Sequence, residues 1–167
     1  MFTATQNRTN TSRFSVIAET SEAKRQPRSY EVPVQYGANQ LLYDLMAVKG
    51  KRALKVSLKG TQEPGWVLTG GFQEGRSYAE AADAWLQKHG ADLVFMFVQF
   101  QGVPIGSMPF VYVARAQEVA DRLKAAKCGT SDTTLRWRHT WKSGCAKGHT
   151  DTVPDAWVFS PKRIDTV

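Results

Sequence analysis

The sequence predicts an α/β fold, in which a central mixed β-sheet is flanked by helices. The clearest helix is Tyr78–His89, because Ser77 can cap its start and Gly90 follows its end. We interpret His89, in the last turn, as a structural residue that the helix dipole favours. Residues 92–100 form a nearly continuous apolar run of strand length. Such a run is typical of a central strand that is buried on both faces.

A β-hairpin precedes this helix and supports the same fold class. Its strands are predicted at 42–48 and 53–58, and the turn at 49–51 contains a glycine that accepts a positive φ. Apolar and polar residues alternate along the second strand, so one face is apolar and the other carries Ser57 and Lys59. The plainest interpretation of this stretch is a hairpin with a solvated, lysine-rich face.

Further helices and strands are predicted around these elements. Helical spacing begins near residue 14 and ends before Pro27, because proline disfavours helical geometry in the residue before it. A second helix is expected over 116–126, with Arg122 and Lys127 exposed. Strands are expected at 30–34, 66–68 and 110–114, and Trp157 and Phe159 are expected to close over the domain.

Asp44 lies early on the first hairpin strand and gives this hairpin a chemical interpretation. If the two strands pair across their turn, Asp44 converges with Ser57 and Lys59 on one side. A carboxylate can hold Mg²⁺, which prefers oxygen ligands. A neighbouring lysine can orient the attacking water and neutralise phosphate charge. The hairpin is therefore a candidate site for metal-dependent chemistry on a phosphate ester.

This pattern resembles the PD-(D/E)XK nuclease superfamily, in particular its endonuclease-like and resolvase-like branches. The motif of that family runs Asp, a spacer, then Glu or Gln, any residue, and Lys. Asp44 matches the Asp, Lys59 matches the Lys, and Ser57 stands where Glu or Gln is expected. The resemblance implies a restriction-endonuclease-like core, Mg²⁺ or Mn²⁺ as cofactor, DNA as partner and a homodimer. Because serine is a weak metal ligand, a catalytically impaired module that binds nucleic acid or a protein is the alternative.

The resemblance implies further site residues. Family members open with a helix whose Glu points into the metal site. Glu19 is the candidate for that position here, and Glu22 is the second choice. The plainer interpretation of Glu19 is a solvent-facing carboxylate. Gln62 matches a position that helps to bind the metal water or DNA. Glu63 would replace the missing carboxylate by a local shift, or would simply be a solvated loop residue. Gly60 is expected to permit a close backbone approach.

Net charge and the C-terminal segment favour a polyanionic partner. The chain has 22 Lys and Arg against 15 Asp and Glu, a net charge of +7. Arg136, Arg138 and Lys142 alternate with tryptophans, a combination that suits phosphates and stacked bases. The same alternation predicts an amphipathic strand whose odd-numbered apolar residues pack on the core. Arg76, just before the first clear helix, is a further candidate for a phosphate contact.

Domain organisation and cellular location follow from composition. Residues 1–12 are polar and predicted as a flexible tail, and residues 13–167 as a single domain with a basic, aromatic C-terminal segment. The sequence contains no run of about 18 apolar residues, so no membrane span is predicted. The start of the sequence lacks an apolar signal core, so secretion is not expected. Two cysteines suit a reducing compartment. We therefore expect a cytoplasmic protein.

Zinc and nucleotide chemistry receive little support from the motifs. A standard zinc finger groups its ligands in close pairs, and the candidate ligands here are spaced differently. They are Cys128, His139, Cys145 and His149. The sequence contains no glycine-rich nucleotide loop and no nucleophile elbow, so a nucleotide enzyme or an esterase is not expected.

Overall fold

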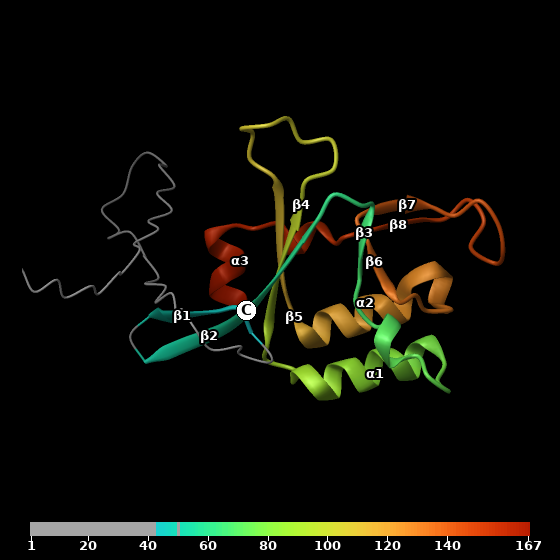
Figure 1. The fold of residues 1–167 in the computed structure, drawn as a ribbon, viewed down its shortest axis with the longest axis horizontal. Coiled ribbons are helices and arrows are strands. Elements are labelled where there is room, and N and C mark those ends of the chain that lie inside the picture. Colours follow the sequence, from blue (N-terminus) through green and yellow to red (C-terminus); the bar gives the residue numbers. More distant parts are fainter. Residues whose placement is uncertain (1–42, 50) are drawn as a thin grey trace, which may run out of the picture.

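The computed structural model describes residues 43–167 apart from Gly50, and the side chains of Lys49 and Arg52 are also outside the description. This part of the chain is an α/β structure with a four-stranded mixed sheet in the order β1-β2-β4-β5 (Figure 1). The predicted fold class is confirmed at this level. The predicted tail, the first helix with Glu19 and Glu22, and the strand at 30–34 lie outside the described residues.

The sheet begins with the predicted hairpin. β1 (Leu45–Lys49) pairs with β2 (Arg52–Thr61) in antiparallel register, and the pairing of Lys49 with Arg52 leaves two residues in the turn. β2 continues three residues beyond the predicted end at residue 58, because it also pairs in parallel with β4 (Val94–Gln99). This second partner satisfies the backbone groups of β2 on its other edge.

β4 is the inner strand that its apolar sequence predicts. It lies between β2 and β5 (Phe110–Arg115), with which it pairs in antiparallel register. Phe95 and Phe97 are fully buried on one face, and Val94 is buried on the other. Burial on both faces explains why this strand has no polar alternation.

α1 spans Tyr78–His89, as the sequence predicts, because both ends carry local signals. The Ser77 hydroxyl accepts a hydrogen bond from the Glu80 N–H, and the Glu80 carboxylate accepts one from the Ser77 N–H. This reciprocal pair is a capping box. Gly90 ends the helix with a φ of 80°, a value that glycine adopts readily. α1 makes the connection between the parallel strands β2 and β4.

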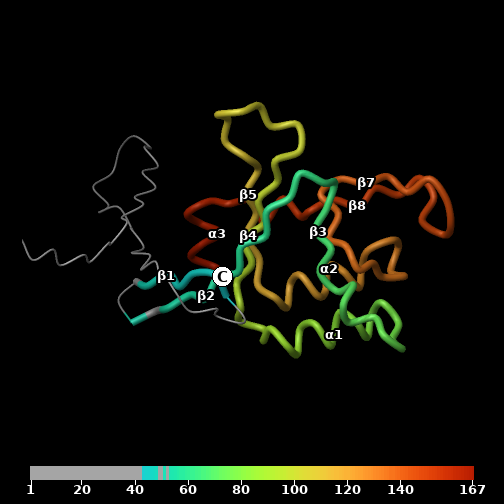
Figure 2. The backbone as a smooth tube through the Cα atoms, in the orientation of Figure 1, coloured from blue at the N-terminus to red at the C-terminus, as the bar shows by residue number. Residues whose placement is uncertain are grey.

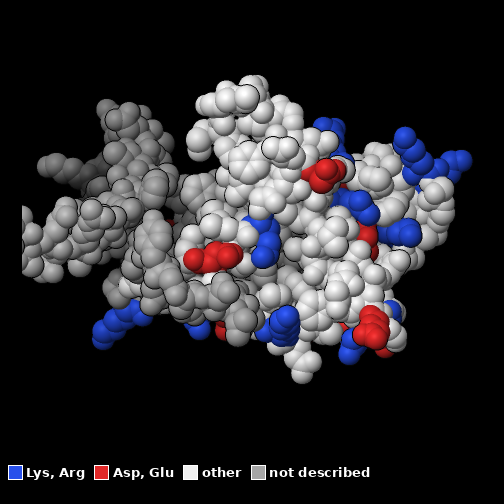
Figure 3. All heavy atoms as spheres, viewed as in Figure 1, with Lys and Arg blue, Asp and Glu red and all other residues white. Residues whose placement is uncertain are grey.

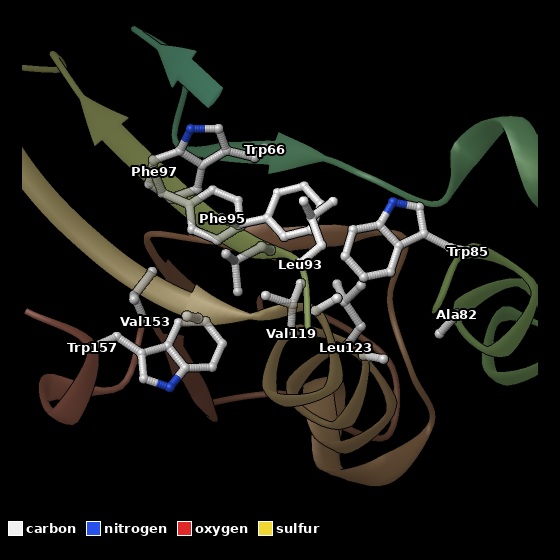
Figure 4. Close-up of a cluster of buried hydrophobic side chains, with 14 residues drawn as sticks. Trp66, Ala82, Trp85, Leu93, Phe95, Phe97, Val119, Leu123, Val153 and Trp157 are labelled. Carbon is white, nitrogen blue, oxygen red and sulfur yellow. The ribbon is translucent and has the colours of Figure 1, made fainter. Parts of the chain in front are cut away.

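α2 and α1 cover the same face of the sheet, and their side chains build the main core (Figure 1). α2 spans Ala116–Gly129, but its backbone leaves helical geometry from Ala126, where the sequence predicts the end. Figure 4 shows Trp85 of α1 and Leu123 of α2 gathered against Phe95 of β4. Trp66 and Trp157 close this core at its margins.

The opposite face of the sheet carries a smaller cluster beneath α3 (Pro161–Thr166). The chain reaches α3 through η2 (Asp155–Trp157), and Val158 bridges Tyr112 of β5 in antiparallel fashion. This segment therefore covers the outer edge of β5, which would otherwise be open to strand pairing. Trp157 packs over the main core as predicted, whereas Phe159 packs on the opposite face.

Two small sheets complete the described structure (Figure 2). β3 (Gly65–Val67) pairs with β6 (Thr134–Arg136), and β7 (Arg138–Thr140) pairs with β8 (Thr150–Thr152). A short helix, η1 (Gly70–Phe72), follows β3. The predicted packing of the odd-numbered C-terminal residues is confirmed, since Leu135 is buried and Trp137 packs on the main core.

The close backbone approach lies at Gly65 and not at Gly60. A Cβ added at Gly65 would lie 2.6 Å from the Leu135 carbonyl oxygen, which belongs to the paired strand β6. A Cβ added at Gly60 would meet a ring carbon of Phe100 at 3.6 Å, an ordinary contact. The prediction for Gly60 is therefore wrong, because its neighbour is a side chain with normal spacing.

Gly65→Ala is expected to destabilise the fold, because the new methyl group would force β3 away from β6. Overpacking of this kind costs about 1–3 kcal/mol. Urea unfolding of Gly65→Ala and of Gly71→Ala measures the effect, since a Cβ at Gly71 meets nothing within 4 Å. Equal stability of the two variants would contradict the described β3–β6 contact.

Candidate functional site

Asp44 and Ser57 lie together at the start of the hairpin. Asp44 lies immediately before β1, and its N–H donates to the Val56 carbonyl at 2.9 Å. Its Oδ2 atom accepts a hydrogen bond from the Ser57 hydroxyl at 3.1 Å and one from the Leu58 N–H at 2.6 Å. No donor from the described residues reaches Oδ1. The carboxylate is thus fixed in place by β2, and its Oδ1 atom has no partner among residues 43–167 apart from Gly50.

Lys59 shares a face of the sheet with this pair but does not contact it. Side chains two residues apart on a strand point the same way, so Lys59 lies on the face that carries Ser57. That is the helix-covered face, because Ser57 and Lys59 pair with Phe95 and Phe97 of β4. Within the described residues, Lys59 forms no ion pair with Asp44. The Trp66 Nε1–H donates to the Lys59 carbonyl at 2.8 Å and anchors the backbone there.

A second lysine borders the same face. The Lys55 ammonium lies 5.5 Å from the centre of the Tyr43 ring, within the range of a cation–π contact. Lys55 precedes Ser57 by two residues and therefore points to the same side of β2. Ser57, Lys55 and Lys59 thus form a polar face of β2, and Asp44 adds its carboxylate to this face from the residue before β1. This set can hold a cation at Asp44 and attract a phosphate at the lysines.

His89 ends α1 above this face. Its ring centre lies 4.8 Å from that of Trp85 and 5.5 Å from that of Phe95, which it meets edge-on. Its Nδ1 atom is buried and has no hydrogen-bond partner among the described residues. Burial lowers the pKa of His89, and the charges of Lys88 and Lys59 lower it further. The helix dipole expected from the sequence would favour the charged ring, so burial and the two lysines outweigh it.

Gln62 and Glu63 lie beyond β2. Both are exposed in the bend that follows Thr61. The Glu63 carbonyl accepts a hydrogen bond from the buried Gln99 side chain at 2.9 Å, which fixes this bend. Thr61 alone lies about 13 Å along the strand from Ser57, at roughly 3.3 Å per residue. Glu63 therefore does not replace the missing carboxylate, and the alternative, a solvated loop residue, is confirmed.

The metal-ligating side chains of the described part of the chain are dispersed. Residues 43–167 without Gly50 contain no group of three or more His, Cys, Asp and Glu side chains placed to hold a metal ion. The cysteines are exposed, and the Cys145 thiol lies 3.9 Å from the Thr130 hydroxyl. Asp44 is thus the one predicted metal ligand that falls within the described residues, because Glu19 lies outside them.

The predicted nucleic-acid residues fall into two environments. Arg138 and Lys142 are exposed on the β7–β8 hairpin with Lys147, and we call these three residues the basic hairpin. Figure 3 shows basic side chains gathered over this end of the molecule. Arg136 is instead tied down, because its guanidinium pairs with Asp132 at 2.8 Å. Arg76 is exposed near α1 and donates to the Phe72 carbonyl at 3.3 Å.

A buried aspartate beneath the basic hairpin has no counterpart in the predictions. Asp151 is 1% exposed and accepts hydrogen bonds from Trp141 Nε1 at 2.6 Å, Arg122 Nη2 at 2.9 Å and the Lys127 N–H at 2.9 Å. The prediction that Arg122 and Lys127 are exposed is wrong, because both are partly buried: the Arg122 guanidinium donates to this carboxylate, and the Lys127 ammonium lies against the Trp141 ring. Burial by itself raises the pKa of Asp151, but the three hydrogen bonds outweigh it and leave the pKa below its ordinary value.

Trp141 belongs to the same network. Its ring lies between two cations, with the Lys127 ammonium 5.2 Å and the Arg136 guanidinium 5.4 Å from the ring centre. Its indole N–H donates a hydrogen bond to the Asp151 carboxylate. Because the ring and the N–H are both engaged within the protein, Trp141 stabilises the β7–β8 hairpin.

No protein-family model matches this chain, and a comparison with curated proteins gives no significant match. The assignment of a function therefore rests on the residues and their geometry. Within the described residues, no helix is long and apolar enough to cross a membrane.

Asp151→Asn is expected to lower the free energy of unfolding by about 3 kcal/mol, because it removes one partner of a buried ion pair. The folded-state pKa of Asp151 lies below its unfolded value, so its contribution is present above the ordinary Asp pKa of about 3.9 and is lost as the pH falls through the lower folded value. The exposed Asp155→Asn provides the control. Urea titrations from pH 7 to pH 3 should therefore show a smaller acid loss for Asp151→Asn than for the unaltered chain; identical pH profiles would refute this.

Proposed function

We propose that this chain is a DNA-binding protein of the PD-(D/E)XK type that cleaves phosphodiester bonds with Mg²⁺ on the polar face of β2. The observation that supports this most is the hydrogen bond between Ser57 and the Asp44 carboxylate, two residues before Lys59 on the same strand face. The order of elements also agrees, since the hairpin is followed by α1 and by a strand parallel to β2. This order of elements is compatible with the core that the motif implies.

The oxygen atoms at Asp44 suit a hard divalent cation. Both described hydrogen bonds reach Oδ2, which leaves Oδ1 for a metal ion. A backbone carbonyl near Ser57 offers a further oxygen, and Glu19 would complete the set. A bound Mg²⁺ would supply the positive charge that polarises the phosphate and lowers the pKa of water.

The other residues of the face have roles that follow from their positions. Ser57 donates a hydrogen bond to Asp44 and thereby orients the carboxylate, as an outer-shell partner does. Lys59, whose ammonium is free of described ion pairs, would hold the attacking water and offset the charge on the phosphate. Arg138 and Lys142 on the basic hairpin would contact the DNA backbone away from the reacting group.

A non-catalytic module that binds nucleic acid or a protein is the second candidate. It is favoured by Ser57, because a neutral hydroxyl stands where the motif has a metal-binding side chain. Ser57 is also 4% exposed and directed at Asp44, so its hydroxyl is committed to the carboxylate. Binding without cleavage would be the outcome of this arrangement.

Nicking of supercoiled and branched DNA in Mg²⁺ or Mn²⁺ distinguishes the two candidates. Cleavage should fall by about 100-fold or more in Asp44→Ala and Lys59→Ala, because each removes an electrostatic contribution to the transition state. Lys162→Ala, on α3 at the opposite face, is the matched lysine control. Ser57→Glu should raise the rate by adding a metal-binding carboxylate, whereas Leu58→Glu on the other side of the strand should not.

Each result has a defined meaning. Metal-dependent nicking that survives in both Asp44→Ala and Lys59→Ala would place the activity elsewhere. Tight, salt-sensitive DNA binding without nicking, in the unaltered chain and in Ser57→Glu, would support the non-catalytic module. Neither nicking nor DNA binding would leave a protein-interaction role.

The basic hairpin is expected to supply part of the salt dependence of DNA binding. Changing Lys142 and Lys147 to Gln should reduce the slope of log affinity against log salt by about 0.9 for each phosphate that the hairpin no longer neutralises. A double variant away from the hairpin, with Lys51 and Lys162 changed to Gln, produces the same change in total charge. Fluorescence anisotropy with a duplex measures both slopes, and equal slopes would show that the hairpin has no special role in DNA binding.

A further inference from the structure

His89 and Lys59 come from different elements and border the same pair of aromatic residues on one face of the sheet. Lys59 pairs with Phe97, and Phe97 stacks on Phe95 with ring centres 5.8 Å apart. His89 meets the Phe95 ring edge-on at 5.5 Å, so the imidazole and the Lys59 side chain border the same pair of aromatic residues on one face of the sheet. The charge of Lys59 accordingly acts on His89. Ser57, which pairs with Phe95, belongs to the same row.

The surroundings of His89 are positive and lack a described counter-charge. Burial lowers the pKa of His89 most, and the positive charges of Lys88 on the same helix and Lys59 on β2 lower it further. Among the described residues, no carboxylate contributes. The C-terminal end of α1 adds only about half a negative charge, which two full positive charges exceed. A bound anion would relieve this repulsion.

The imidazole is arranged to donate a hydrogen bond to such an anion. Its Nδ1 atom is buried without a partner among the described residues. A bare ring nitrogen is less costly to bury than an N–H donor without an acceptor, which favours the tautomer that carries its proton on Nε2. The ring is only partly buried, so Nε2 is the nitrogen available to a ligand.

We propose that His89 and Lys59 together bind one phosphodiester group of a nucleic-acid backbone on the helix-covered face of β2. The choice of a nucleic acid as the source of this phosphate rests on the proposed function. The motif that includes Asp44, Ser57 and Lys59 has no histidine, so His89 is an addition to that site. Neither cleavage nor a metal ion is required for this contact.

Phosphate binding at this position has a consequence that can be measured. A negative charge within about 4–6 Å of the imidazole should raise its pKa by about one pH unit. By linkage, the affinity for the phosphodiester should increase by up to about tenfold as the pH falls from above the His89 pKa of the complex to below the His89 pKa of the free protein. Binding should nevertheless persist at pH 8, because neutral His89 still donates through Nε2.

The test is a histidine titration by NMR on the full chain, in EDTA, with and without a thymidine dinucleotide that carries one phosphodiester. The pKa of His89 should rise with the dinucleotide, while those of His139 and His149 serve as internal controls. The rise should disappear in Lys59→Gln. His89→Gln, which keeps a side-chain N–H donor, should bind the dinucleotide without the pH dependence. His89→Leu should bind the dinucleotide at least about tenfold more weakly. Thermal unfolding of each variant reports whether it folds.

Two results would overturn the proposal: a dinucleotide that binds while the His89 titration is unchanged, and no binding at any pH between 5.5 and 8. Failure of the proposed function gives a different result. If the His89 pKa rises as expected but no DNA is nicked in Mg²⁺ or Mn²⁺, the phosphate site stands and the nuclease assignment does not. If DNA is nicked but His89 is unaffected, the nuclease assignment stands alone.

Discussion

The parallel pairing of β2 with β4 is the constraint on which the rest of the structure depends. It can form only because α1 carries the chain back to the starting end of the sheet. It sets Ser57 beside Phe95 and Lys59 beside Phe97, and so places polar groups next to the core aromatics. The same connection delivers His89, the last residue of α1, to the end of β4 where Phe95 lies. One register therefore assembles both the core and the candidate site.

Asp44, the residue before β1, adds a carboxylate to this arrangement by a departure from regular strand pairing. At Asp44 the regular ladder ends, and the carboxylate replaces a backbone carbonyl as acceptor for the Leu58 N–H. This hydrogen bond gives the Leu58 N–H an acceptor on that side of β2, and it helps to fix the Asp44 carboxylate through neutral donors. A fixed carboxylate with an open oxygen is useful to a cation, whereas a flexible surface Asp is not.

Local signals made the main elements predictable. Ser77 marks the start of α1 and Gly90 marks its end, and a nearly continuous apolar run identifies β4. The pairing of Asp44 with Ser57 was also accessible, because hairpin register follows from the turn. The fold class, an α/β structure with a mixed sheet, followed from these elements, whereas the order of the strands came from the structure.

Nonlocal features were not accessible in the same way. Asp151 collects donors from α2, from the residue that follows its helical part and from the loop before β8, and no spacing in the sequence relates them. The partial burial of Arg122 was missed because its helical position faces a segment that lies almost thirty residues later in the sequence. Likewise, Glu63 seemed close to Ser57 in sequence, but an extended strand separates them.

Mn²⁺ binding measured by electron paramagnetic resonance is the sharpest test of whether Asp44 holds a metal ion, because it needs neither DNA nor turnover. We predict one bound Mn²⁺ per chain, abolished in Asp44→Asn and retained in Asp155→Asn. Equal Mn²⁺ binding by the unaltered chain and by Asp44→Asn would contradict this prediction, since the carboxylate fixed by Ser57 and Leu58 would then hold no metal.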